Sequence, residues 1–199
     1  DGKQGYLPHP TPHAAYAAMV SRLDKDVGRI LDLIAELGLD SSTIIFFCSD
    51  NGPTYDRIGG ADSDFFDSAA GLRARKGSVY EGGIRVPLIA RWPGKIRPGE
   101  TCGIPCASYD LMPTLLDLAR APAEPGLDGI SLTPALLNSG DQPRHDYLYW
   151  EFPSYGGQQA LLAGKYKAVR QQMNKGPIRT ELYDLAADEH ETHDLAPDH

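Results

Sequence analysis

The chain has 199 residues, a formal net charge of -8 and 41% hydrophobic residues. The acidic surplus argues against nucleic acid as a partner, and the longest apolar runs are too short to cross a bilayer. Three cysteines are too few for a disulfide scaffold; Cys102 and Cys106 either pair in an oxidising compartment or stay reduced. The length and composition fit one or two domains with a real hydrophobic core.

A long amphipathic helix is predicted near the start of the chain. Apolar residues recur at helical spacing from Tyr16 to Leu37, and Gly38 is a suitable terminator. His9 and His13 precede this pattern in a proline-rich lead-in, so we expect both to be loop residues.

The run that follows predicts a strand over residues 43–49. Its β-branched and aromatic composition is typical of a strand covered on both faces. It delivers Asp50 and Asn51 side by side, and ligands in open α/β sheets bind beyond the carboxyl ends of strands. Two hard oxygen ligands suit Ca²⁺ or Mg²⁺. The alternative is that Asp50, Asn51 and Gly52 form only a turn.

A long loop over residues 53–71 leads into the most basic part of the chain. Such a loop in a compact domain is more often functional than structureless. Residues 72–87 then combine paired glycines, which allow close backbone approach, with the four cations Arg73, Arg75, Lys76 and Arg85. Lys76 suits an anionic oxygen that gains charge in a transition state. The alternative is a solvated lysine, with the arginines paired to surface acids.

Further elements are predicted downstream. Residues 86–92 form a second strand, and Ser108 or Asp110 begins a helix to Leu118 with Pro113 in or near its first turn. The chain changes character near residue 140. Four strands follow, separated by turn residues, at 146–152, 158–163, 166–170 and 180–185.

These four strands predict a small antiparallel sheet with one solvated face. We therefore divide the chain into residues 1–140 and 141–199, and expect the sheet to pack on the helix at 110–118. Tyr155, Gln158 and Gln159 either line a substrate cleft or are surface and turn residues, which we favour. The His- and acid-rich tail 188–194 either binds a metal or, as we expect, is poorly ordered.

Two motifs carry a family resemblance. They are Thr-Ile-Ile-Phe-Phe-Cys-Ser-Asp-Asn-Gly-Pro and Arg-Lys-Gly-Ser-Val-Tyr-Glu-Gly-Gly-Ile-Arg-Val-Pro, followed by Trp-Pro-Gly. The chain resembles the C-terminal portion of arylsulfatase-type sulfatases of the alkaline phosphatase superfamily. The resemblance implies an α/β fold: part of an alkaline-phosphatase-like mixed sheet flanked by helices, followed by the small antiparallel sheet.

The resemblance also implies site residues. Asp50 and Asn51 match metal ligands, normally to Ca²⁺, and Lys76 matches a lysine that contacts the sulfate group. The family's nucleophile is a formylglycine made from a Cys-x-Pro-x-Arg motif, and none of Cys48, Cys102 and Cys106 has that context. We therefore expect the chain to be catalytically incomplete by itself.

The implied activity is hydrolysis of a sulfate ester on a small molecule or glycan. The implied location is periplasmic, secreted or lysosomal, without a membrane span. Edge groups and apolar surface left open predict self-association of the isolated chain. Two alternatives remain: part of a phosphodiesterase or phosphonate hydrolase relative, or a non-catalytic binding module on the same fold.

Overall fold

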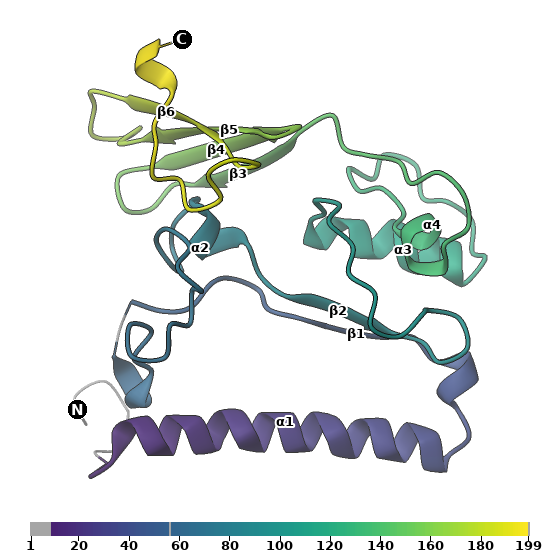
Figure 1. The fold of residues 1–199 in the computed structure, drawn as a ribbon. Coiled ribbons are helices and arrows are strands. Elements are labelled where there is room, and N and C mark those ends of the chain that lie inside the picture. Colours follow the sequence, from purple (N-terminus) through teal and green to yellow (C-terminus); the bar gives the residue numbers. More distant parts are fainter. Residues whose placement is uncertain (1–8, 56, 199) are drawn as a thin grey trace.

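The computed structural model describes residues 9–55 and 57–198 as a mixed α/β structure with two antiparallel sheets (Figure 1). Short 3₁₀ turns connect some of the elements. The helices and strands are α1 (Pro12–Glu36), β1 (Ile45–Cys48), α2 (Glu81–Ile84), β2 (Leu88–Arg91), α3 (Leu111–Leu118), α4 (Thr133–Leu137), β3 (Leu148–Phe152), β4 (Gln158–Ala163), β5 (Tyr166–Gln171) and β6 (Arg179–Asp184). No helix among the described residues is long and apolar enough to span a membrane.

The predicted N-terminal helix is confirmed as α1, and it starts earlier than its apolar pattern. Pro12 occupies the first helical position, where its fixed φ is favourable. The prediction that His13 is a loop residue is therefore wrong, whereas His9 lies outside any helix or strand. The ring of His13 stacks on Phe65 at 4.1 Å between centroids, and its Nε2 lies 3.2 Å from Asp62 Oδ2. This tertiary contact holds the first turn.

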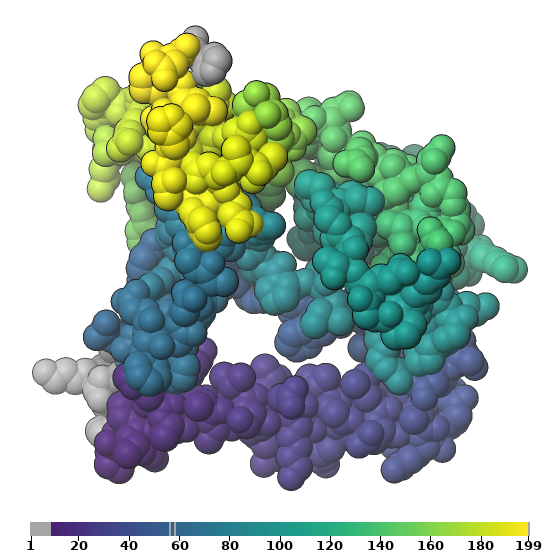
Figure 2. Space-filling view, in the orientation of Figure 1, coloured from purple at the N-terminus to yellow at the C-terminus, as the bar shows by residue number. Residues whose placement is uncertain are grey.

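The predicted strands around Asn51 form an antiparallel pair, β1 with β2, in which Phe47 lies opposite Ile89. Within the described chain β1 is not covered on both faces, because Phe47 is 41% exposed, and Ile89 on β2 is 58% exposed. Apolar surface is left open, as expected for the chain by itself. Figure 2 shows open space between the middle of α1 and the β1–β2 pair. The described residues of this chain supply no layer that fills it.

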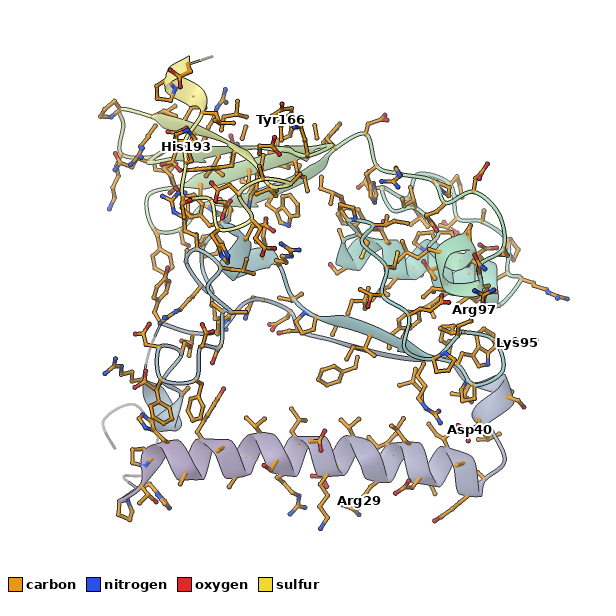
Figure 3. All side chains as sticks on the ribbon, in the orientation of Figure 1. Arg29, Asp40, Lys95, Arg97, Tyr166 and His193 are labelled. Carbon is orange, nitrogen blue, oxygen red and sulfur yellow. The ribbon has the colours of Figure 1, made fainter. Side chains whose placement is uncertain are left out.

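The apolar stripe of α1 is exposed as well. Its members are Met19, Val20, Leu23, Ile30, Leu33 and Leu37. Arg29 points away from the β1–β2 pair (Figure 3), so the charged side of the helix faces outward. On that side Asp26 accepts hydrogen bonds from Arg22 and Arg29. The amphipathic pattern is thus real, although its apolar side lacks a covering partner within the described chain.

The C-terminal sheet has the predicted strands, paired in the order β3-β4-β5-β6. Leu148 is 4% exposed and its neighbour Tyr149 44%, which confirms one solvated face. The prediction that this sheet packs on the helix at 110–118 is wrong. Its inner face packs instead on Val79 and Tyr80, just before α2, in a core completed by Ala160, Val169 and Tyr183. The domain boundary after residue 140 stays a prediction.

The predicted helix at 111–118 is confirmed as α3, with Pro113 in its first turn. Asp110, which is fully buried, precedes it and gathers three separate segments. Its carboxylate accepts hydrogen bonds from the amides of Ala107 at 2.7 Å and Ile130 at 2.9 Å, and pairs with His145 Nε2 at 2.8 Å. One buried acid therefore fixes the chain path on both sides of α3.

The C-terminal tail is built into the fold, so the prediction of a poorly ordered end is wrong. The Leu195 amide donates to the Leu182 carbonyl at 2.8 Å, and Glu191 is 1% exposed. Burial alone would raise the pKa of Asp194, but hydrogen bonds from the amides of Leu182 and Ala196 outweigh it, and the pKa is lowered. In the described part of the chain, no group of three or more His, Cys, Asp or Glu is arranged to hold a metal.

Candidate active site

Two loops meet at the end of the β1–β2 pair. The Gly52 amide donates to the Gly83 carbonyl at 2.9 Å, and the Lys76 amide donates to the Pro53 carbonyl at 2.8 Å. A Cβ atom on Gly52 would lie 1.9 Å from the Gly82 oxygen, so only glycine permits this approach. The main chain therefore brings the segment after β1 alongside the segment that carries Lys76.

Asp50 and Asn51 emerge at this junction as adjacent oxygen donors. Asp50 is exposed, and among the described residues it forms no ion pair. Asn51 is half-buried, and its side-chain nitrogen donates to the Gly52 carbonyl at 3.0 Å. The Ser49 hydroxyl donates to the Asn51 carbonyl at 2.8 Å and steadies the turn.

Ca²⁺ takes about six to eight oxygen ligands. The Asp50 carboxylate and the Asn51 amide oxygen have the right chemistry for part of such a shell. The pair therefore fits a Ca²⁺ site as contributors, with further ligands required to complete it. The Gly52–Gly83 and Lys76–Pro53 hydrogen bonds place the segment of these two residues beside the Lys76 loop.

The four cations of residues 72–87 have different environments. Arg75 pairs with Asp64, and Arg85 Nη1 lies 3.2 Å from Glu189 Oε2; both partners are exposed acids, as predicted. Arg73 instead donates to the buried Tyr183 hydroxyl at 2.6 Å. Lys76 is exposed and, within the described residues, forms no ion pair. It is the cation of this segment that remains available to an anion.

A buried charged cluster, formed by Lys167, Glu81 and Glu191, anchors the segment after Lys76 to the C-terminal sheet. Lys167 Nζ lies 2.7 Å from Glu81 Oε1 and 2.8 Å from Glu191 Oε1, and the Glu81 amide donates to Glu191 at 2.7 Å. Burial raises the pKa of Glu191, although Lys167 opposes the shift. Sequence reasoning missed this cluster because nothing in the local pattern links Lys167 to Glu81.

A second buried network lies beside it. The hydroxyls of Tyr80 and Tyr183 donate to the same Glu181 oxygen at 2.5 and 2.6 Å. Burial, together with the bond to Glu181, raises the pKa of both phenols. The Arg73 guanidinium lies 3.9 Å from the centre of the Tyr80 ring, an attractive cation–π distance. The C-terminal sheet thus binds the Tyr80–Glu81 turn through two contacts, Glu181 with Tyr80 and Lys167 with Glu81.

Gln158 on β4 binds the main chain directly after Lys76. The prediction that Gln158 is a surface residue is wrong. It is 6% exposed, and its side chain donates to the Gly77 carbonyl at 3.1 Å and accepts from the Val79 amide at 3.4 Å. Tyr155 is a turn residue, 80% exposed, as predicted. Gln159 is half-buried and donates to Glu151 at 3.2 Å.

The sequence matches two family models. The Sulfatase model covers residues 3–121, and the model for the C-terminal part of N-sulphoglucosamine sulphohydrolase covers residues 74–199. This chain belongs to the sulfatase family. The family resemblance and the expected α/β fold are therefore confirmed.

Similar proteins agree with this assignment. The chain is 42% identical to human arylsulfatase A over 73% of its own length, but spans only 28% of that enzyme. The crystal structure of Ps i-CgsB in complex with k-i-k-neocarrahexaose matches 96% of this chain and 40% of that chain, with a TM-score of 0.78 and 30% identity. Phosphonate monoester hydrolase of Agrobacterium radiobacter matches 92% of this chain and 36% of that chain, with a TM-score of 0.67 and 25% identity.

Proposed function

We propose that this chain supplies part of the active site of a sulfate-ester hydrolase. One observation carries the proposal: Asp50, Asn51 and Lys76, whose side chains form no ion pair with any described residue, lie on two loops that the Gly52–Gly83 hydrogen bond joins. In the proposed site Asp50 and Asn51 are two of the Ca²⁺ ligands, and Lys76 binds an oxygen of the sulfate group.

Each residue has a distinct part in the proposed chemistry. A bound Ca²⁺ would neutralise sulfate charge and orient the reacting groups. Lys76 donates hydrogen bonds to the oxygen on which charge builds as the ester bond breaks. The 199 residues hold no Cys-x-Pro-x-Arg motif, so the formylglycine nucleophile must come from outside them. We therefore expect this chain alone to show no turnover.

The substrate is proposed to be a sulfated small molecule or glycan, and Ps i-CgsB, a similar structure, was solved with an oligosaccharide. We propose the same periplasmic, secreted or lysosomal location that the family resemblance implies. These assignments rest on membership of the sulfatase family.

Hydrolysis of a phosphonate or phosphodiester is the second candidate function. The similarity to phosphonate monoester hydrolase favours it, because the same cation and oxygen donors suit a phosphoryl group. The two candidate functions differ in whether the site prefers a sulfate ester or a phosphorus ester. Comparing turnover of one substrate of each kind therefore separates them.

The test uses the full-length protein that carries this chain. Lys76→Ala and Asp50→Ala should each lower kcat for 4-nitrophenyl sulfate by roughly 100-fold or more. Lys95 is also exposed, and it follows β2 at the end of the β1–β2 pair opposite to this junction (Figure 3). Lys95→Ala is therefore the control. Wild-type turnover by both site variants contradicts the proposal. Turnover of bis-4-nitrophenyl phosphate in preference to the sulfate supports the second candidate.

A further inference from the structure

One buried amide side chain bonds the turn after Lys76 to the C-terminal sheet, which lies directly over the α2 region in Figure 1. Gln158, the first residue of β4, is 6% exposed. Its side-chain nitrogen donates to the Gly77 carbonyl at 3.1 Å, and its side-chain oxygen accepts from the Val79 amide at 3.4 Å. The two bonds therefore reach the main chain on both sides of Ser78, directly after Lys76.

We propose that Gln158 is a positioning residue for Lys76: its amide fixes the main chain after Lys76, so that the ammonium group meets the sulfate oxygen in one geometry. The inference rests on the proposed sulfate-ester hydrolase and adds a residue of the C-terminal sheet that acts through Lys76. Two features carry it: the anchoring of the main chain on both sides of Lys76, and the fixed orientation of the Gln158 amide.

The main chain is anchored before and after the Lys76 side chain. The Lys76 amide donates to the Pro53 carbonyl at 2.8 Å, and the next carbonyl, that of Gly77, is bonded to Gln158. Gly77 has a φ of +84°, and a Cβ atom there would lie 2.7 Å from the ring of Tyr155, so the chain passes tightly against the β3–β4 turn. The position of the Lys76 Cα is therefore set by these contacts.

The orientation of the Gln158 amide is fixed as well. Gln171 lies opposite Gln158 on β5 and donates to its side-chain oxygen at 3.3 Å, beside the Val79 amide. Because two N–H donors meet this oxygen, the nitrogen is left to face the Gly77 carbonyl. A rotated amide would place N–H groups against N–H groups in a buried position, which costs free energy. The sheet thus holds the donor in place for Gly77.

A small displacement of Lys76 matters for the proposed chemistry. Lysine carries its charge on a flexible stem, so the side chain does not fix its own position. Misplacing a catalytic group by about 1 Å can cost roughly 100-fold in rate. Gln158→Leu fills a similar volume and removes both bonds to the turn. We therefore expect the turn to shift and the ammonium group to lose its alignment.

The test measures kcat and KM for 4-nitrophenyl sulfate in the full-length protein that carries this chain. Gln158→Leu should lower kcat about tenfold or more and change KM by less than about twofold, because Lys76 acts on the oxygen that gains charge in the transition state. Gln159→Leu is the matched control, since Gln159 is the next residue of β4 and donates to Glu151 instead. Thermal unfolding checks that each variant is folded at the assay temperature.

The double variant Lys76→Ala/Gln158→Leu tests whether Gln158 acts through Lys76. Once the lysine side chain is removed, a positioning residue has nothing left to position. The double variant should therefore have the kcat of Lys76→Ala alone. A residue that only stabilises the sheet would instead lower kcat by the same factor with and without the lysine.

Gln158→Glu provides a reversible form of the same test. An ionised carboxylate cannot donate to the Gly77 carbonyl, whereas a protonated acid can donate to it and still accept from the Val79 amide. The side-chain partners of Gln158 among the described residues are all uncharged, and burial raises the pKa of a carboxyl that lacks a cationic partner. The kcat of Gln158→Glu relative to wild type should therefore rise as pH falls through that pKa, whereas Gln158→Leu should stay impaired at every pH.

The outcomes separate the two levels of inference. If Lys76→Ala keeps wild-type turnover, the proposed function fails and the role of Gln158 fails with it. If Lys76→Ala is impaired but Gln158→Leu behaves like Gln159→Leu, or the two losses multiply in the double variant, the proposed function stands and the positioning role is wrong. A folded Gln158→Glu variant that does not recover in acid also contradicts the positioning role.

Discussion

Replacing Lys167 with methionine should strongly destabilise the C-terminal sheet and the turn it holds. Lys167 is fully buried, and its ammonium group is the cation that neutralises both Glu81 and Glu191. Methionine fills a similar volume but leaves two buried carboxylates without their partner. Breaking a buried ion pair from one side costs about 3 to 5 kcal/mol in the free energy of unfolding.

Lys165→Met is the matched control. Lys165 lies two residues away, its side chain is 51% exposed, and its ion pair with Asp184 faces solvent. Loss of an exposed pair costs about 1 kcal/mol or less. Since each kcal/mol moves the Tm of a domain of this size by about 2–4 °C, Lys167→Met should lower Tm by ~6–20 °C and the control by far less.

The assays are thermal unfolding for Tm and urea unfolding for the free energy of unfolding, both followed by tryptophan fluorescence, because Trp150 packs against the core of the sheet. Adding Glu191→Gln to Lys167→Met should recover part of the loss, since it removes one of the unpaired buried charges. If the two lysine variants lie within 1 kcal/mol of each other, the buried charged cluster does not hold the sheet in place and the reasoning fails.

Three further predictions concern stability and association. The pKa of Asp194 is lowered in the folded chain, so its carboxylate stabilises the fold above its ordinary pKa, and this contribution is lost as pH falls through the folded value. The free energies of unfolding of Asp194→Asn and wild type should therefore converge in acid. A difference between them that is constant at all pH values would count against this prediction. Gly52→Ala should abolish the close approach to Gly82 and unfold the junction. Gly28 in α1 has open space around it, so Gly28→Ala should stabilise the fold by up to about 1 kcal/mol. Equal effects of the two variants in thermal melts would refute this prediction. The exposed apolar face of the β1–β2 pair should make the isolated chain self-associate, and Ile89→Lys should reduce the self-association measured by light scattering. A wild-type chain that is a stable monomer would contradict this prediction.

Much of the local structure follows from the sequence. The apolar spacing of α1 and the alternation in β3 each recur over a few residues, and both elements form where that spacing predicts them. Asp50, Asn51 and Lys76 were predicted as candidate site residues from a strand end, a basic glycine-containing segment and the family resemblance, and they stay a prediction. The hydrogen bonds Gly52–Gly83 and Lys76–Pro53 bring their two segments together, which no local pattern shows.

The tertiary structure alone decided the partners of the buried groups. Glu81 and Lys167 lie 86 residues apart, and His13 and Asp62 49 residues apart, so no window of sequence relates them. The same holds for the tail, whose acidic composition predicts a solvated end although Glu191 is buried against Lys167. Periodicity reports only whether a side chain favours burial or water. Which group compensates a buried charge depends on the path of the whole chain, and that path is fixed by packing between distant segments.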